Sequence, residues 1–205
     1  MEPPKGFIRT RSYKEYVTRE RAPDPSRAVL LVIDMQEFFR SCAEDILPAI
    51  LQIIRDARRA KVPIVYTRTA YQEGEEHGIL GEWWEGVIDD GLKESELMPE
   101  VEFDPEQDKM IRKLTYSAFN GTDLESYCKD LGRDEVIVTG VMTNLCCETT
   151  ARDAFCRGFR VFFTTDATST SSEEMHTATL SNIGFGFGYL VDKDSIKLDR
   201  ELKSG

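Results

Sequence analysis

Three residues with complementary chemistry each come where an apolar run of the chain ends. Asp34 ends the run in VIDMQ, Lys113 ends a shorter run in IRKLTYSAF, and Cys146 follows the run in VTGVMTNLCCETTARDAF. A carboxylate can act as a base, and a thiol that loses its proton is a strong nucleophile, especially beside an ammonium group. Taken singly, such residues are more often a turn residue, a solvated charge and a core thiol. Together they predict a cysteine hydrolase that attacks a carbonyl carbon.

Two adjacent cysteines compete for the role of nucleophile, and helical phase separates them. Cys147 shares its stripe with apolar residues, whereas Cys146 shares its face with polar ones. The apolar stripe continues through Ala151, Ala154 and Phe155, and the polar face through Thr150, Asp153 and Arg157. We therefore expect the sulfur of Cys146 to face a cleft and that of Cys147 to face the core. Cys146 also lies near the expected start of a helix, after the capping candidates Thr143 and Asn144, where the helix dipole favours a thiolate.

The remaining cysteines and the histidines are less well placed for catalysis. Three cysteines have no comparable setting and are expected to be small buried hydrophobes: Cys42, Cys128 and Cys156. Histidine, the usual partner of a nucleophilic thiol, occurs only as His77 in a charged stretch and as His176 inside an expected helix. Asp34 is therefore the better candidate base.

Apolar runs and helical patterns alternate along the chain and would position these residues. Runs without polar alternation are typical of strands covered on both faces, and they occur at 28–33, 62–66, 110–113, 136–139, 159–163 and 187–191. Helical patterns occupy 43–60, 123–131, 145–157 and 172–183, the last with a serine cap at Ser171 or Ser172. The order predicts an α/β protein with a mostly parallel six-stranded sheet and helices on both faces. Because ligands bind beyond the carboxyl ends of parallel strands, Asp34, Lys113 and Cys146 are expected to meet there.

Length, charge and cysteine usage limit the class of protein. A chain of 205 residues is within the range of one domain, and a net charge of −11 without a basic patch argues against a nucleic-acid or membrane partner. Five cysteines without CxxC spacing, and no apolar signal segment, predict reduced thiols in a cytoplasmic protein.

The chain divides into an arm, a domain and a tail. Residues 1–27 are polar and punctuated by proline, 28–192 carry the strand and helix patterns, and 193–205 form a charged tail. The segment 70–108, rich in Glu and Gly, breaks the rhythm and is expected to be an insertion over the active site. We expect the arm to lie on the surface or on a neighbouring subunit of a homo-oligomer.

Three motifs resemble those of the isochorismatase-like cysteine hydrolases. They are VIDMQ with a following Phe39, KLTYSAF at 113–119, and GVMTNLCCETTARDAF at 140–155, and their order and spacing also fit. The resemblance covers 28–191 apart from much of the insertion. It implies a three-layer α/β/α, Rossmann-like fold and a catalytic triad of Asp34, Lys113 and Cys146.

Within that superfamily, VTGVMTNLCCETTARDAFCRGFRVFFTTDAT, EEMHTATL and FGYLVD are most similar to plant-type nicotinamidases. This resemblance implies hydrolysis of a small-molecule amide, nicotinamide to nicotinate plus ammonia, through a thioester on Cys146. Asp34 would be the base, and Lys113 would stabilise the thiolate and keep Asp34 ionised.

The proposed mechanism also needs an oxyanion hole and walls for the substrate, and the resemblance adds a cis Val141–Met142 peptide bond. Backbone N–H groups of Met142 and Cys146 would hold the oxyanion, with a cis Val141–Met142 peptide directing the Met142 N–H into the pocket. Four aromatic residues are candidate walls for a flat substrate, although each could be ordinary core: Phe38, Phe39, Trp83 and Trp84.

No metal and no other cofactor is expected. Metal-dependent nicotinamidases carry an Asp-x-His and a further His beyond the second strand, whereas this chain reads YTRTAYQEGEEHG there. A single histidine among glutamates, His77, is more typical of a solvated surface than of a metal site.

Three alternatives to the nicotinamidase function stay open. Isochorismatase activity needs only protonation of a vinyl ether, so it would leave the nucleophile Cys146 without a role. Hydrolysis of a ureidoacrylate or N-carbamoyl amide would use the same chemistry as nicotinamide. A non-catalytic scaffold would have no reason to combine the three reactive groups.

Overall fold

A computed structural model describes residues 12–17 and 19–198. Its six strands form one sheet in the order β3-β2-β1-β4-β5-β6, and every neighbouring pair is parallel. The strands are β1 (Ala28–Ile33), β2 (Ile64–Thr69), β3 (Lys109–Lys113), β4 (Glu135–Val141), β5 (Arg160–Ser169) and β6 (Tyr189–Val191). The predicted six-stranded α/β fold is confirmed, with a sheet that is wholly parallel rather than mostly so.

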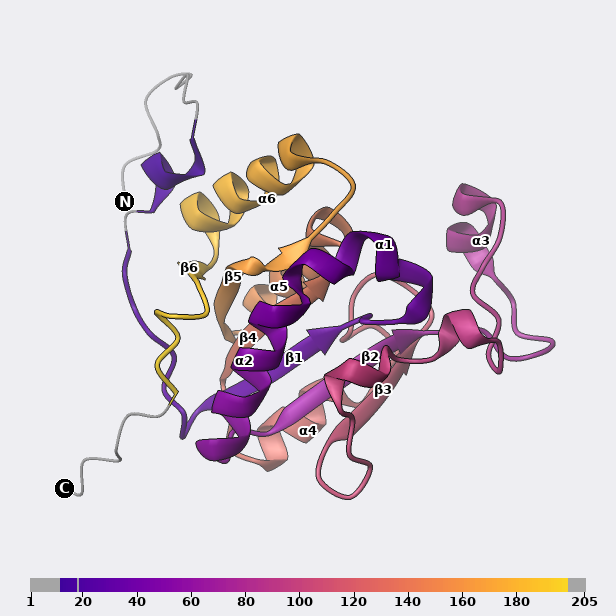
Figure 1. Ribbon diagram of the computed structural model, residues 1–205, viewed down its shortest axis with the longest axis horizontal. Helices are drawn as coiled ribbons and strands as arrows, with labels where there is room; N and C mark the ends of the chain where they lie inside the picture. The colour runs from indigo at the N-terminus through magenta and orange to yellow at the C-terminus, as the bar shows by residue number, and fades with distance from the viewer. Residues whose placement is uncertain (1–11, 18, 199–205) are drawn as a thin grey trace.

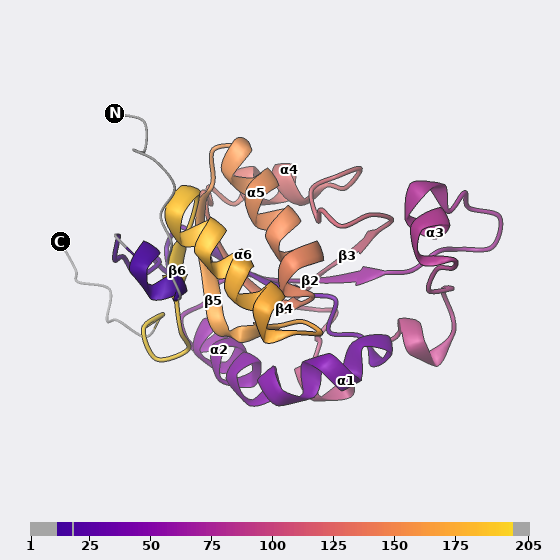
Figure 2. The ribbon, with the colours of Figure 1, turned by 90° about the horizontal axis from the view of Figure 1, so that it is seen from above.

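Helices cover both faces of the sheet (Figures 1 and 2). Figure 2 shows α1 and α2 on one face and α4, α5 and α6 on the other, while α3 lies beyond one end of the sheet. Their bounds are α1 (Arg40–Ala43), α2 (Leu47–Arg59), α3 (Gly78–Trp84), α4 (Leu124–Asp130), α5 (Glu148–Cys156) and α6 (Glu173–Gly186). Short 3-10 turns occupy Tyr13–Tyr16, Glu37–Phe39, Glu44–Ile46, Lys93–Ser95 and Pro99–Val101, and a π-helical turn occupies Thr143–Cys147. No helix in the described ranges is long and apolar enough to cross a membrane.

The central strand explains why continuous apolar runs form this sheet. All six residues of β1 are fully buried, and alternate side chains enter two cores on opposite faces of the sheet. Leu30 and Val32 pack in the core that contains α2, and Val29 and Leu31 pack in the core that contains α5. A strand buried on both faces must be apolar at every position, which is the pattern that the sequence shows.

Two element boundaries differ from the sequence-based expectation for local reasons. The expected helix 43–60 is interrupted, and α2 begins at Leu47 with Pro48 in its first turn. Proline is tolerated there because N–H groups of the first turn have no acceptor within the helix, so the N–H that proline lacks is not missed. Strand β2 begins at Ile64, after Pro63, and continues to Thr69.

The predicted serine cap of α6 is Ser172, whose hydroxyl accepts a hydrogen bond from the Met175 N–H at 3.2 Å.

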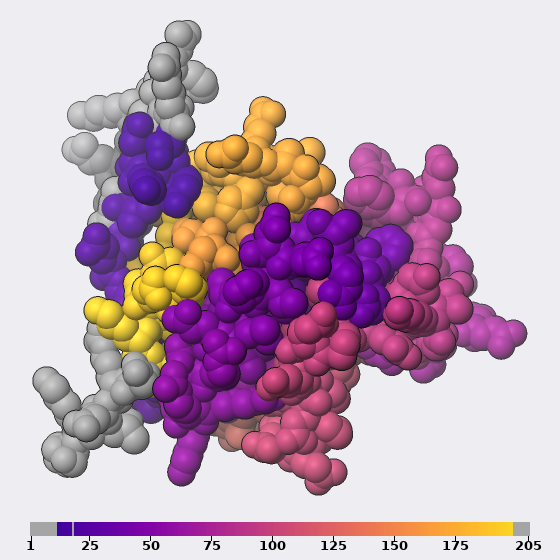
Figure 3. All heavy atoms as spheres, in the orientation of Figure 1, coloured from indigo at the N-terminus to yellow at the C-terminus, as the bar shows by residue number. Residues whose placement is uncertain are grey.

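The described part of the arm lies at the opposite end of the molecule from α3 (Figure 3). Tyr16 packs edge-on against Phe185 of α6, and Arg21 pairs with buried Glu135 at 2.6 Å. The arm therefore contacts its own domain at these points. Residues 1–11 and 18 of the expected arm, and 199–205 of the expected tail, lie outside the described residues.

Gly140 allows β4 to approach β1 closely. Its φ is +106°, and a Cβ built there would lie 2.0 Å from the Ile33 carbonyl oxygen. The β4 register shifts at this point, between Val138 and Gly140. Only glycine tolerates both the backbone conformation and the contact.

Replacing Gly140 with Ala should lower the free energy of unfolding by more than about 3 kcal/mol, because it adds a backbone clash to backbone strain. Gly132→Ala is the matched control, since Gly132 has a φ of +66° and open space around it. It should lose only about 1–2 kcal/mol. Urea unfolding of both variants measures the difference, and equal losses would show that the close approach to Ile33 is unimportant.

Candidate active site

The three candidate catalytic residues meet at the carboxyl end of the sheet. The strand order reverses direction between β1 and β4, and such a switch point is where open α/β sheets bind ligands. The Lys113 Nζ lies 2.7 Å from Asp34 Oδ2 and 3.3 Å from Cys146 Sγ. A carboxylate, an ammonium and a thiol thus share one buried cluster.

Strand β2 supplies the residues that hold Asp34, because it lies between β1 and β3. The Thr67 hydroxyl donates to Asp34 Oδ1 at 2.7 Å, and the Thr69 hydroxyl donates to Oδ2 at 3.3 Å. Asp34 itself has a φ of 49°, a left-handed conformation that Asp tolerates better than most residues. Its carboxylate is therefore fixed in position by groups from two strands, Thr67 and Thr69 of β2 and Lys113 of β3.

Lys113 is buried yet fully provided with partners. Besides Asp34 and Cys146, its Nζ donates to the Thr69 hydroxyl at 2.7 Å and to the Thr115 carbonyl at 3.1 Å. Burial acts to lower the pKa of Lys113, but the negative charge of Asp34 and the interactions with Asp34 and Cys146 together raise it by more. The lysine therefore stays positively charged in the closed site.

Cys146 as a whole residue is 7% exposed, and it contributes to the cavity surface. The pKa of its thiol is raised to about 12: burial is the largest cause, Asp34 adds to it by its charge and by a hydrogen bond, and the charge of Lys113 opposes both. Lys113 acts in the direction expected, toward the thiolate, but the effect of removing the sulfur from water is larger. The resting thiol is neutral near pH 7 and needs a base during reaction.

Helical phase separates the two adjacent cysteines as expected, with one exception in the stripe. Cys147, Ala151 and Ala154 are fully buried, and the Cys147 Sγ lies 3.9 Å from the Thr139 carbonyl. Phe155, expected on the same buried stripe, is half exposed, and its ring packs against that of Phe187 with 6.2 Å between the ring centroids. The end of α5 lies near the surface, so its apolar stripe ends before that turn.

The other expected core cysteines differ from one another. Cys128 is buried, Cys42 is partly buried, and Cys156 is exposed. Cys156 is the last residue of α5, and the prediction that it is buried is wrong.

The Val141–Met142 peptide bond is cis, as the resemblance predicted. The segment that follows forms a π-helical turn in which the Leu145 and Cys147 N–H groups both donate to the Met142 carbonyl. Within the described residues, the Met142 N–H has no such acceptor. Met142 and Cys146 both border the cavity.

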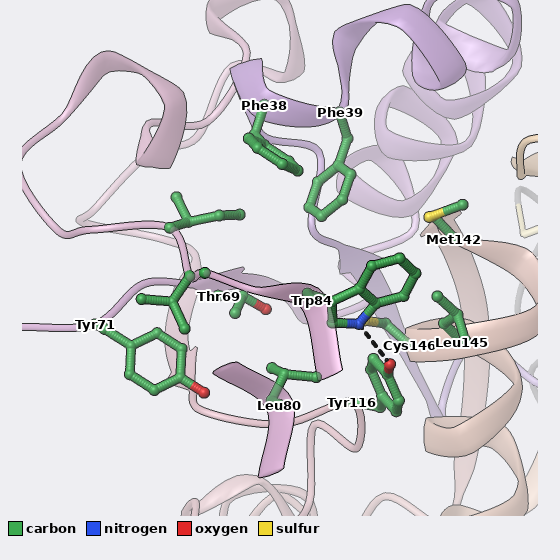
Figure 4. Close-up of a pocket in the computed structure, with 13 residues that line it drawn as sticks. Phe38, Phe39, Thr69, Tyr71, Leu80, Trp84, Tyr116, Met142, Leu145 and Cys146 are labelled. Atoms are coloured by element: carbon green, nitrogen blue, oxygen red, sulfur yellow. Dashed lines mark hydrogen bonds between the residues drawn. The ribbon is translucent and has the colours of Figure 1, made fainter. Parts of the chain in front are cut away.

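A cavity of about 430 Å³ opens above the cluster (Figure 4). Its walls are mostly aromatic and aliphatic, and no lysine, arginine, histidine, aspartate or glutamate of the described residues lines it. The lining residues are Phe38, Phe39, Thr69, Tyr71, Leu80, Trp84, Gly86, Val87, Ile88, Tyr116, Met142, Leu145 and Cys146.

Of the four aromatic residues expected as walls, Trp83 lies elsewhere. Phe38, Phe39 and Trp84 line the cavity, whereas Trp83 is 74% exposed and does not. Consecutive residues of a helix point about 100° apart, so α3 turns Trp84 toward the cavity and Trp83 away. The sequence could not give the phase of so short a helix.

Several cavity residues were not expected from the sequence. Tyr71 and Ile88 come from the 70–108 segment, whose irregular pattern gave no basis for placing single side chains. Tyr116 lies inside the quoted motif KLTYSAF, three residues after Lys113, so the motif was a signal that could have identified it.

The two histidines lie outside the catalytic cluster. The His77 ring packs edge-on at 5.3 Å against Tyr71, and His176 contacts the Thr143 hydroxyl at 2.9 Å and the Thr165 carbonyl at 3.2 Å. Across 12–17 and 19–198, no group of three or more His, Cys, Asp or Glu side chains is arranged to hold a metal ion.

Comparison with known proteins identifies the family. The isochorismatase domain model matches residues 28–195. The chain is 53% identical over 188 residues to Nicotinamidase 3 of Arabidopsis thaliana, covering 91% of this chain and 95% of that protein. It is 31% identical to the isochorismatase of Bacillus subtilis, covering 85% of this chain and 58% of that protein.

A solved structure agrees with these matches. The cysteine hydrolase from Pseudomonas syringae pv. phaseolicola 1448A superposes with a TM-score of 0.81 at 25% identity, covering 87% of this chain and 95% of the other. Sequence and fold thus lead to the same group of enzymes. The chain belongs to the isochorismatase family.

Proposed function

We propose that this protein hydrolyses nicotinamide to nicotinate and ammonia, with Cys146 as nucleophile. The observation that carries the proposal is the buried Asp34–Lys113–Cys146 cluster beneath an uncharged, aromatic cavity. The 53% identity to Nicotinamidase 3 of Arabidopsis thaliana supports the choice of amide.

The lack of charge in the lining favours nicotinamide over the alternatives. Isochorismate carries two carboxylates, and ureidoacrylate and most N-carbamoyl amides carry one. Burying a carboxylate against apolar walls without a cationic partner is costly. Nicotinamide is flat and neutral, so it can use the aromatic walls without that cost.

Acylation begins with proton transfer from Cys146 to Asp34. Because the resting thiol is neutral, Asp34 removes the proton as sulfur bonds to the carbonyl carbon. Lys113 contacts both groups and stabilises the negative charge as it moves from the carboxylate to the sulfur. The C–N bond then breaks, the proton on Asp34 passes to the leaving nitrogen, and ammonia departs from a thioester on Cys146.

Deacylation repeats the proton transfers with water. Asp34, ionised again, takes a proton from a water molecule that attacks the thioester carbonyl. The C–S bond breaks, the proton passes from Asp34 to the sulfur, and the acid leaves as nicotinate after releasing its own proton to solvent. In both half-reactions we assign the oxyanion to the Met142 and Cys146 N–H groups, because both residues border the cavity.

We also propose that the enzyme is a cytoplasmic homo-oligomer that needs no metal. Its five cysteines are free, which suits a reducing compartment. The exposed Ile79 and Trp83 of α3 give an apolar surface that a second subunit would cover. A monomeric mass in sedimentation would disprove the oligomer.

Wild-type protein should release ammonia from nicotinamide far faster than from ureidoacrylate, and should not convert isochorismate, because only nicotinamide lacks a carboxylate. Coupled ammonia detection and chromatography measure the panel. Dialysis against EDTA should leave turnover unchanged. Preference for a carboxylate-bearing substrate would overturn the proposal, and no turnover of any compound would favour a scaffold.

Cys146→Ala should reduce kcat by at least about a thousandfold while the protein stays folded, because its side chain faces the cavity. Cys147→Ala should instead lower stability by about 1 kcal/mol and retain turnover, since its sulfur packs in the core. Steady-state kinetics and urea unfolding separate the two effects. Wild-type turnover by the Cys146 variant would exclude it as the nucleophile.

Lys113→Met should raise the thiol pKa still further, because it removes the charge that lowers it. Thiolate forms above the pKa, so the variant should be alkylated by iodoacetamide at least about tenfold more slowly at any pH between 8 and 10. Lys109→Met, on the same strand but partly exposed, is the control. Unchanged alkylation of Cys146 in the Lys113 variant would place the lysine outside the reaction.

A further inference from the structure

Most polar groups of the cavity lining are already engaged with the protein. The Tyr71 hydroxyl donates to the Leu114 carbonyl at 2.6 Å. The Thr69 hydroxyl is held between Lys113 and Asp34. These groups have no hydrogen left to offer a ligand.

Tyr116 differs, because its hydroxyl acts only as an acceptor. It receives a hydrogen bond from the Trp84 indole Nε1 at 2.8 Å, shown as the dashed line in Figure 4. A phenol can also donate one hydrogen, and no group in the described residues accepts that of Tyr116. Tyr116 therefore presents an unused donor in the wall of an otherwise apolar cavity.

The position of this hydroxyl is well defined. Tyr116 follows Thr115, whose carbonyl binds Lys113, and its own carbonyl receives a hydrogen bond from Thr150 at 3.4 Å. The Trp84 indole, which lies beside Tyr116 in the cavity wall, then holds the hydroxyl end of the ring. An oriented donor that itself accepts a hydrogen bond is also strengthened by polarisation.

We propose that Tyr116 is a specificity-determining residue that donates its O–H to the ring nitrogen of a heteroaromatic amide. The inference rests on the proposed amidase function, because Cys146 fixes the carbonyl end of the substrate. Apolar walls alone cannot distinguish a pyridine ring from a benzene ring of the same shape. A ring nitrogen accepts one hydrogen bond, and Tyr116 offers the matching donor.

The discriminating pair of ligands is nicotinamide and benzamide, which differ by one ring atom. Their dissociation constants can be measured by calorimetry in the Cys146→Ala background, where no turnover occurs. Tyr116→Phe should weaken nicotinamide binding about three- to tenfold, the range of one net hydrogen bond. Benzamide binding should change by less than about twofold, because benzamide has no acceptor to lose.

Tyr71→Phe is the matched control, since it removes a hydroxyl from the same cavity that is already bonded to Leu114. It should leave the ratio of the two dissociation constants unchanged. A second test compares the dissociation constants of the two ligands in the protein that keeps Tyr116. This protein should bind nicotinamide about three- to tenfold more tightly than benzamide.

The outcomes separate this inference from the proposed function. If the protein with Tyr116 intact binds both ligands equally, or if Tyr116→Phe weakens both by the same factor, Tyr116 does not read the ring nitrogen. Either result can occur while wild-type enzyme still releases ammonia from nicotinamide, and then only the inference fails. Failure of wild-type enzyme to hydrolyse nicotinamide overturns the function instead.

Discussion

The buried ion pair between Asp34 and Lys113 is the constraint on which the site depends. Both side chains are fully removed from solvent, and their closest atoms are 2.7 Å apart. Two such charges can stay buried only if each is paired and its remaining hydrogen bonds are made. Thr67 and Thr69 meet this requirement, which explains why a polar strand end, rather than another apolar residue, lies between β1 and β3.

The same pair determines how the thiol is used. A sulfur buried beside a carboxylate has a raised pKa, and the lysine reduces this effect without cancelling it. The cluster therefore suits a nucleophile that is generated at the moment of attack, with the proton moving to a nearby base. It also keeps a reactive thiolate from persisting in the resting enzyme, where oxidation would be favoured.

The cavity above the cluster combines residues from distant parts of the chain. Phe38 and Phe39 follow β1, Trp84 belongs to α3, and Leu145 lies in the turn after β4. In the proposed reaction the cluster supplies the chemistry, and these walls together with Tyr116 contact the substrate.

The sequence by itself determined the strands and their parallel arrangement, and it indicated the three candidate catalytic residues. The apolar composition of a strand and the 3.6-residue period of a helix both depend on which side chains are buried. Residues close together in the sequence were therefore enough to predict β1, α2 and the different surroundings of Cys146 and Cys147. Motif order further indicated the family and the cis Val141–Met142 bond.

Only the tertiary structure decided the protonation state of Cys146, the outward orientation of Trp83 and the partners of Tyr116. Each depends on groups far apart in the sequence. A pKa is the balance of burial and charges contributed by several strands, and the direction of a side chain on short α3 depends on how that helix docks. Short sequence patterns do not contain this information, because these contacts and their combined effect on a pKa exist only in the folded chain.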